Sequence, residues 1–371
     1  MYSIKLETAA QRGNNNLDLI RLFLAILVIY GHSFSVNPSS GMGSDILYSI
    51  TGFHSGDIAI KGFFLISGFL VTDSILAHRS SMQYIVSRFF RIWPPLVVVV
   101  LLSALVMGPL VTSLSLDEYF ADVGLRNYIS KTITLQNWGG QSVGYFELPG
   151  VFSNNTYPGF VNAPLWSLNA EVFGYFIVLF VFLAGGMHRF VAAILFTLII
   201  ADSLLPEKAL FYWLPQNSTD FSALPFCFAF GVIMSIFKRD VTLNVSAIVG
   251  LIAVNHFIEG PLIKPLLAYT ILFLAIFLVA SSKTARALHI PYDISYGVFL
   301  YGWPIQQIIA FYYPNWPHLL SLTASVLMAF VAGYLSCVFV EKPSQKCGKA
   351  VMRLWRSYVP ANKNTARDQS R

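Results

Sequence analysis

The chain has 371 residues, of which 56% are hydrophobic and only 11% are charged, and its mean hydropathy is +0.63. This composition is typical of a polytopic membrane protein. The net charge of +6 does not indicate a nucleic-acid-binding protein, because the basic residues are distributed as a membrane topology requires.

Ten apolar runs predict ten membrane-spanning helices, so the expected fold class is an all-α transmembrane bundle. The runs cover about residues 17–36, 57–77, 92–112, 163–185, 189–204, 220–237, 243–258, 262–280, 292–313 and 318–340. With the N-terminus in the cytoplasm, eighteen of the 24 lysines and arginines fall on the inner side and only four in outer loops. This asymmetry follows the positive-inside rule, and an even number of spans places both termini in the cytoplasm.

Three segments are expected along the chain. Residues 1–16 form a cytoplasmic N-terminal segment, residues 17–343 the transmembrane domain, and residues 344–371 a basic, partly disordered cytoplasmic tail that contacts anionic lipid. The first span is interpreted as a retained helix, because no small-residue cleavage site follows it. The three cysteines imply no disulfide framework, and the sequence shows no metal-ligand cluster, Walker motif or dinucleotide fingerprint.

The run Leu17–Phe34, LDLIRLFLAILVIYGHSF, places three ionisable residues inside a membrane helix. Asp18, Arg21 and His32 fall on one helical face, along a stripe about 20 Å long. Ionisable groups in a membrane are costly and mark functional sites by default. The alternative is structural, with an Asp18–Arg21 pair that anchors the helix end and a His32 that bonds to a neighbouring backbone.

The second span begins with Asp57 and Lys61, four residues apart, which predict an ion pair near the outer surface. Further along this span, Gly62 and Gly68 are small residues that let neighbouring helices approach closely. The long outer stretch at about residues 113–162 is expected to lie over the membrane mouth as a lid.

The inner segment SRFFRIWPPL carries Arg88 and Arg91, which stand three apart and therefore on the same side of a helix. Arg21 also lies near the inner surface, and three converging guanidinium groups would suit the oxygens of a phosphate. The alternative is that these arginines only enforce topology. Pro94 and Pro95 are expected to break the helix before the third span.

The fourth span starts as NAPLWSLNAEVFGYF, with Trp166 at the interface and Asn169 and Glu171 below the outer surface. Counted from the start of this span, Glu171 lies about 10 Å deep, and His32 lies about 7 Å from the outer end of its own span. The matching depths predict that Glu171 and His32 meet as an acid/base pair in a polar cavity. The alternative is a Glu171 that is protonated or bonded to another helix.

The ninth span, YDISYGVFLYGWPIQQII, is dense in polar and aromatic residues. Tyr301 and Gln306 are candidate contacts for a sugar or pantetheine group, and Trp166 and Asn169 of the fourth span are further candidates for substrate binding. The alternative is that the stripe in the ninth span only packs against neighbouring helices.

Five blocks together resemble the integral-membrane acyltransferase 3 family. They are LDLIRLFLAILVIYGH, KGFFLISGFL, RFFRIWPPL, PLWSLNAEVF and DISYGVFLYGWPI, and they follow the family's order between about Leu17 and Pro343. The first block is similar to the family's signature of an arginine, ten residues and a histidine. The resemblance implies about ten transmembrane helices and a donor that is acyl-coenzyme A, usually acetyl-CoA, acting as a co-substrate and not as a permanently bound cofactor. It implies an acceptor hydroxyl on a cell-envelope or exported polysaccharide, or on its lipid-linked precursor, and a location in the bacterial cytoplasmic (inner) membrane.

The resemblance also implies that His32 is catalytic and that Arg21, Arg88 and Arg91 belong to the donor site. Many members have a histidine in the ninth-span block where this chain has Gly302, so the role of that histidine does not transfer. Other members carry a fused extracytoplasmic hydrolase-like domain. This chain is expected to be the stand-alone form.

We expect the three arginines to hold the donor's phosphates while the thioester extends up a channel beside the first helix to His32. His32 would take the proton from the acceptor hydroxyl, with Glu171 or Asp18 orienting the imidazole. An acyl-histidine intermediate is the alternative mechanism. The alternative function is a carrier or flippase for a glycan-related solute, in which the buried charges line the solute path.

Overall fold

The computed structural model describes residues 3–37, 45–136, 147–205, 210, 223–260, 263–288 and 290–358. In these residues the chain is mainly helical, as predicted, with one small antiparallel sheet of β1 (Ser3–Lys5) and β2 (Thr242–Asn244) that pairs Ile4 with Leu243. The helices, in which η2 and η5 are π-helical and η4 is a 3₁₀ turn, are α1 (Leu6–Ala10), α2 (Leu17–Val36), α3 (Ile46–Thr51), α4 (Ser55–His78), α5 (Ser81–Leu102), η2 (Ser103–Met107), α6 (Gly108–Val111), α7 (Leu116–Ala121), α8 (Val123–Ile133), η4 (Ala163–Leu165), α9 (Trp166–Leu183), α10 (Arg189–Leu204), α12 (Leu224–Ile236), α13 (Val245–Phe257), α14 (Ile263–Ala280), α15 (Lys283–Ala287), α16 (Ser295–Tyr312), α17 (His318–Ser336), η5 (Cys337–Glu341) and α18 (Lys342–Tyr358).

Each of the ten predicted spans contains a helix, and six of the described helical stretches are long and apolar enough to cross a membrane. These six are Leu17–Val36, Ser55–His78, Ser81–Val111, Ala163–Leu183, Ile263–Ala280 and His318–Tyr358. Two further apolar helices, α12 and α13, are shorter. The chain is therefore an integral membrane protein, whereas the total of ten spans and the cytoplasmic position of both termini remain predictions.

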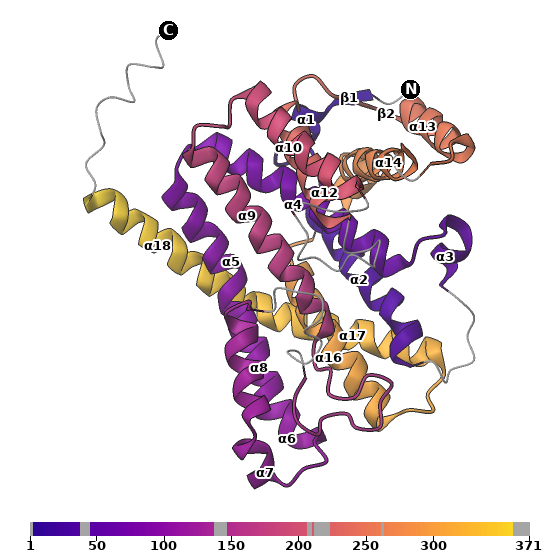
Figure 1. Ribbon diagram of the computed structural model, residues 1–371, viewed down its shortest axis with the longest axis vertical. Helices are drawn as coiled ribbons and strands as arrows, with labels where there is room; N and C mark the ends of the chain where they lie inside the picture. The colour runs from indigo at the N-terminus through magenta and orange to yellow at the C-terminus, as the bar shows by residue number, and fades with distance from the viewer. Residues whose placement is uncertain are drawn as a thin grey trace.

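Helix α4 packs against α2, α9 and α12 and forms the centre around which the other helices are arranged (Figure 1). Small residues allow the close contact with α12, as predicted for Gly68. A Cβ atom on Gly68 would lie only 2.1 Å from the carbonyl oxygen of Phe228. In the first two turns of α4, Asp57 and Lys61 form the predicted ion pair, which is buried.

Helix α5 runs without a break through Pro94 and Pro95, so the predicted helix break is wrong. A proline lacks the N–H group that would bond to the carbonyl four residues earlier. For Pro94 this carbonyl belongs to Phe90, and the hydroxyl of Ser344 in α18 donates a 2.6 Å hydrogen bond to it. Because α18 packs along α5 (Figure 1), a side chain of α18 replaces the bond that the proline removes.

Residues 147–162 enter the bundle and do not lie over it as the predicted lid. Phe152 and Val161 are fully buried, and the side-chain amide of Asn162 donates a 2.8 Å hydrogen bond to the carbonyl of Leu300 in α16. Irregular backbone at such depth is tolerated only where protein surrounds it. Helix α9 therefore begins beside the middle of α16, inside the bundle. The part of the predicted loop at 137–146 lies outside the described residues.

The predicted tail is helical as far as Tyr358. Helix α17 continues through the π-helical turn η5 into α18, which carries lysines and arginines together with the exposed side chains of Leu354 and Trp355. Residues 359–371, for which disorder was expected, lie outside the described residues.

Candidate functional site

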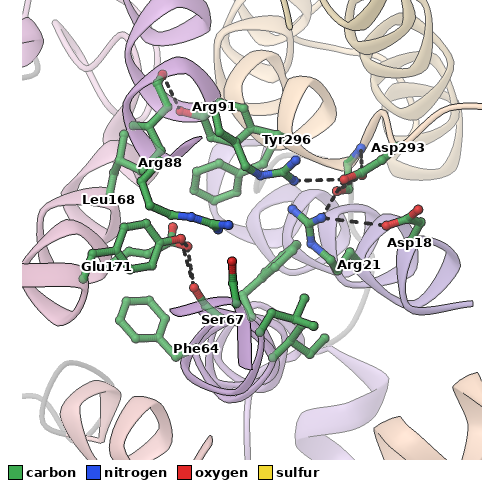
Figure 2. A pocket seen from close by; sticks show the side chains of 18 of the residues that line it. Asp18, Arg21, Phe64, Ser67, Arg88, Arg91, Leu168, Glu171, Asp293 and Tyr296 are labelled. Atoms are coloured by element: carbon green, nitrogen blue, oxygen red, sulfur yellow. Dashed lines mark hydrogen bonds and ion pairs between the residues drawn. The ribbon is translucent and has the colours of Figure 1, made fainter. Parts of the chain in front are cut away.

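A cavity of about 760 Å³ lies between α2, α4, α5, α9 and the segment that leads into α16. Its exposed rim is formed by the start of α2 and the end of α4. The three arginines that the sequence singled out, Arg21, Arg88 and Arg91, all line this cavity, and Asp18 and Glu171 line it with them (Figure 2). Three helices thus bring to one place side chains that lie up to about 150 positions apart in the chain.

Asp293 holds two of the three arginines. Its Oδ2 atom accepts a hydrogen bond of 2.6 Å from Nη1 of Arg21 and one of 2.9 Å from Nη2 of Arg91 (Figure 2). Its other oxygen accepts hydrogen bonds from the backbone N–H and the hydroxyl of Ser295. Because the carboxylate is held by four donors, Arg21 and Arg91 are fixed in position and part of their charge is neutralised.

Arg88 is placed differently from the other two arginines. Its guanidinium group points into the cavity between Glu171 and Arg21 (Figure 2), and no carboxylate of the described residues lies within 4.0 Å of it. Its Nε atom is buried and has no hydrogen-bond partner, and the group lies 5.8 Å from the ring centre of Tyr175. A guanidinium group that lines a cavity without a carboxylate partner is suited to bind an anion there.

Glu171 belongs to a polar cluster on the cavity wall. The hydroxyl groups of Ser67 and Tyr175 both donate to its Oε1 atom, at 2.7 and 2.5 Å (Figure 2 shows the bond from Ser67). Helices α4 and α9 are thereby joined through polar side chains in the interior. The predicted alternative, a Glu171 bonded to another helix, describes this arrangement.

Glu171 and His32 are not brought together, because they lie at different depths. Gly31 packs against Gly56, so the turn of α2 that carries His32 lies beside the first turn of α4. Ser67, the partner of Glu171, lies eleven residues further along α4, about 16 Å away along the helix axis. The depth of Glu171 was predicted by counting residues from the start of its helix, on the assumption that the helix starts at the outer surface. The prediction is wrong because α9 begins inside the bundle.

His32 does not line the cavity. Its ring packs edge-on against Trp303, with 5.0 Å between ring centres, and it makes no hydrogen bond to any described residue. Trp303 in turn contacts Tyr157 of the inserted segment, at 5.3 Å between ring centres. The imidazole therefore contacts an aromatic ring of α16, which itself packs against the segment 147–162.

Apolar side chains separate the arginines from His32. Along α2 the cavity lining ends at Arg21, and Ala25 and Val28, the next residues on that face, are buried. Phe63 and Phe299, with 6.2 Å between their ring centres, line the cavity and pack against the two apolar clusters that contain Val28 and Ala25. In the described part of the chain, the expected open channel from the arginines to His32 is therefore closed by packed side chains.

Asp18 lies at the mouth of the cavity, with its Oδ1 atom 4.0 Å from Nη1 of Arg21. The weak Asp18–Arg21 pair that was considered from the sequence is thus present. Asp18 stands fourteen residues before His32 on the same helix, about 21 Å away, so it does not orient the imidazole.

The four predicted substrate contacts all lie outside this cavity. The amide nitrogen of Gln306 donates a 2.8 Å hydrogen bond to the carbonyl of Ile29, so its amide joins α16 to α2. Asn169 is buried, and Tyr301 and Trp166 are half-buried against the apolar core. Their role in binding a substrate remains a prediction.

Gly302, which stands where many family members have a histidine, faces Ile29 of α2. A Cβ atom on Gly302 would lie 2.8 Å from Cγ1 of Ile29. We expect Gly302→Ala to destabilise the protein by about 1–3 kcal/mol through overpacking. The measurement is the thermal unfolding temperature of the protein in detergent. Gly250→Ala in α13 is a matched control, because nothing lies within 4 Å of a Cβ atom there; equal stability of the two variants would contradict the prediction.

Asp293, Ser67 and Tyr175 received no role from the sequence. Tyr175 follows Glu171 by four residues and thus shares its helical face, a signal that could have been used. Asp293 is the carboxylate of the ninth-span block, and three half-buried guanidinium groups imply such a counter-charge. Nothing local to Asp293 indicates which arginines it meets, because α2 and α5 supply them.

A protein-family model and two known proteins match this chain. A family model described as an acyltransferase domain matches residues 14–342. The chain is 25% identical over 343 residues to an O-acetyl transferase of Shigella phage Sf6, a match that covers 89% of this chain and 95% of that protein. It is 42% identical over 104 residues to nodulation protein 10 of Rhizobium leguminosarum bv. viciae, which is 26% of each chain. No solved structure matches.

Proposed function

Because this chain belongs to the integral-membrane acyltransferase 3 family, we propose that it transfers an acyl group, most simply acetyl, from acyl-coenzyme A to a hydroxyl of a glycan. The acceptor would be a cell-envelope or exported polysaccharide or its lipid-linked precursor. The observation that carries the proposal is the convergence of Arg21, Arg88 and Arg91 on one cavity, which suits a donor with several phosphate groups. The phage O-acetyl transferase that matches most of the chain supports the choice of acetyl.

In the donor site we propose that Arg88 makes the main contact with a phosphate. Arg21 and Arg91 share Asp293, so each has less charge to offer, whereas Arg88 lines the cavity with no carboxylate of the described residues within 4.0 Å. Asp293 acts as a positioning residue that keeps the two other guanidinium groups on the cavity wall. Glu171, which accepts hydrogen bonds from the hydroxyl groups of Ser67 and Tyr175, forms another polar part of the same cavity wall.

For the chemical step we propose His32 as the general base. Its imidazole takes the proton of the acceptor hydroxyl while the hydroxyl oxygen attacks the thioester carbon. The new C–O bond forms, the C–S bond breaks, and the leaving thiolate of coenzyme A receives the proton. In the alternative mechanism His32 is itself acylated before the acceptor attacks.

The thioester has to pass Phe63 and Phe299 to reach His32. We propose that these two rings turn aside when the donor is bound, since both line the cavity and neither is fully buried. Rotamer changes of partly exposed side chains occur within nanoseconds and need no rearrangement of the helices. On the far side, we propose that a sugar ring packs on Tyr157, which is half-buried and lies beside Trp303.

The proposed location is the cytoplasmic membrane of a bacterium, with both termini in the cytoplasm. The strong excess of lysine and arginine on one side supports this orientation. It places the mouth of the cavity, at the start of α2 and the end of α4, toward the compartment that supplies acyl-coenzyme A.

The test uses the full-length protein purified in detergent, without a sealed compartment. With acetyl-CoA and de-O-acetylated envelope polysaccharide, we expect free coenzyme A thiol to be released and the glycan to gain the mass of acetyl groups. A thiol reagent and mass spectrometry of the glycan measure the two products. A carrier or flippase would release no thiol under these conditions, and that result would refute the proposed enzyme.

A further inference from the structure

The mouth of the cavity carries two basic side chains that the donor site described above does not use. Arg12 lies in the turn between α1 and α2, and His78 is the last residue of α4. Both are exposed, whereas Arg88 and Arg91 are half-buried, so the cavity has a basic group deep inside and a second basic region at its rim.

The carboxylates near this rim are already paired. Asp73 accepts a hydrogen bond from Lys238, and Asp18 lies 4.0 Å from Arg21. No carboxylate of the described residues lies within 4.0 Å of Arg12. Arg12 therefore makes no direct ion pair with the described residues and can form one with a ligand at the mouth.

The backbone around Arg12 is held in place. The side-chain amide of Asn15 donates hydrogen bonds to the carbonyls of Ala9 and Gln11, and the amide of Asn14 donates to the carbonyl of Thr8. A basic side chain on a fixed turn loses less freedom on binding than one on a mobile loop. The position of Arg12 is thus suited to recognising one group of a ligand.

His78 has one ring nitrogen available. Its Nδ1 atom lies 2.9 Å from the carbonyl oxygen of Ser74. A carbonyl only accepts hydrogen bonds, so Nδ1 carries the hydrogen and donates it. The Nε2 atom makes no bond to the described residues, and after protonation it can donate to an anion.

We infer that Arg12 and His78 form a subsite for a phosphomonoester at the mouth of the cavity. The inference rests on the proposed function, in which the ligand is coenzyme A and the phosphomonoester is its 3′-phosphate. In coenzyme A the thioester end and the 3′-phosphate lie at opposite ends of the molecule, with the diphosphate between them. With the thioester directed inward, Arg88 contacts the diphosphate, and Arg12 and His78 at the rim contact the 3′-phosphate. As a monoester, the 3′-phosphate carries more negative charge than either phosphate of the diphosphate.

The experiment measures equilibrium binding of coenzyme A and of 3′-dephospho-coenzyme A to the full-length protein in detergent. We expect the wild type to bind coenzyme A about tenfold more tightly than the dephospho compound, because one charge-assisted contact is lost. Arg12→Gln should bind both compounds nearly equally, at the affinity that the wild type shows for the dephospho compound. Arg79→Gln is the matched control, because Arg79 is exposed and adjacent to His78 but does not line the cavity, and it should keep the wild-type preference.

The outcomes separate this inference from the proposed function. If coenzyme A binds in an Arg88-dependent manner but Arg12→Gln keeps the wild-type preference, the 3′-phosphate subsite is refuted and the donor site stands. If the wild type binds both compounds equally, the subsite is likewise refuted. If neither compound binds, the donor assignment fails and the subsite fails with it.

Discussion

Replacement of His32 by alanine should abolish acyl transfer while the protein still folds and inserts. A positioned general base contributes about 10²- to 10⁴-fold to the rate, and loss of an acylated nucleophile would cost at least as much. The fold should survive, because the imidazole makes no hydrogen bond to a described residue and only one edge-on contact with Trp303. Such an aromatic contact is worth about 0.5–1.5 kcal/mol.

The measurement is release of coenzyme A thiol by equal amounts of wild-type and His32→Ala protein in detergent, with expression and gel-filtration profile recorded. His54→Ala is the matched control, since His54 is exposed, stacks on Tyr48 and does not line the cavity. Wild-type rates with His32→Ala would remove His32 from the mechanism. They would also shift attention to the cluster around Glu171 as the reactive centre.

The same variant distinguishes the two proposed mechanisms. With radiolabelled acetyl-CoA and no acceptor, rapid acid quenching traps any acyl-protein. Label that is present in the wild type and lost in His32→Ala would indicate an acyl-histidine intermediate. Absence of label in the wild type, together with full transfer activity, would favour direct attack by the acceptor hydroxyl.

Replacement of Arg88 by alanine should raise the KM for acetyl-CoA by about 10- to 100-fold, with a smaller effect on kcat. A phosphate contact far from the thioester is made in both the ground state and the transition state, so its loss weakens binding more than chemistry. Arg88→Lys should recover only part of the affinity, because an ammonium group does not reproduce the planar fork.

Arg91→Ala should raise the donor KM less than Arg88→Ala does. Arg91 already donates a hydrogen bond of 2.9 Å to Asp293, so less of its charge is available to a phosphate. Asp293 keeps Arg21 as a partner when Arg91 is removed. Arg286→Ala, in the exposed helix α15, controls for a general loss of positive charge. Equal KM values for Arg88→Ala and wild type would show that the phosphate lies elsewhere.

Local patterns predicted the elements well. Apolar runs indicated where each helix lies, because burial in lipid demands long apolar segments with all backbone groups paired. The i,i+4 spacing of Asp57 and Lys61 predicted their ion pair, because the two residues share one helical face. The wrong prediction at Pro94 shows the limit of such rules, since a serine of a distant helix satisfies the backbone there.

The structure brings the three predicted arginines to one cavity and places Glu171 there as well, away from His32, while the roles of these residues remain predictions. Arg21 lies in the second turn of α2, and Arg88 and Arg91 lie just before the apolar part of α5, so hydropathy along each helix predicted that the three lie near the same membrane surface. For Glu171 the count assumed that its helix starts at the membrane surface. The segment 147–162 instead enters the bundle, so the start of α9 lies deeper and Glu171 joins the arginines.

Hydropathy and helical periodicity are local properties, so they were sufficient to predict the membrane class, the positions of the helices and the face of α2 that carries Asp18, Arg21 and His32. The packing of the helices establishes that Asp293 joins Arg21 to Arg91, that no carboxylate of the described residues lies within 4.0 Å of Arg88, and that Phe63 and Phe299 lie between the cavity and His32. These features depend on how deep each helix starts and which neighbour it meets. Long-range packing sets both, and no local pattern contains them.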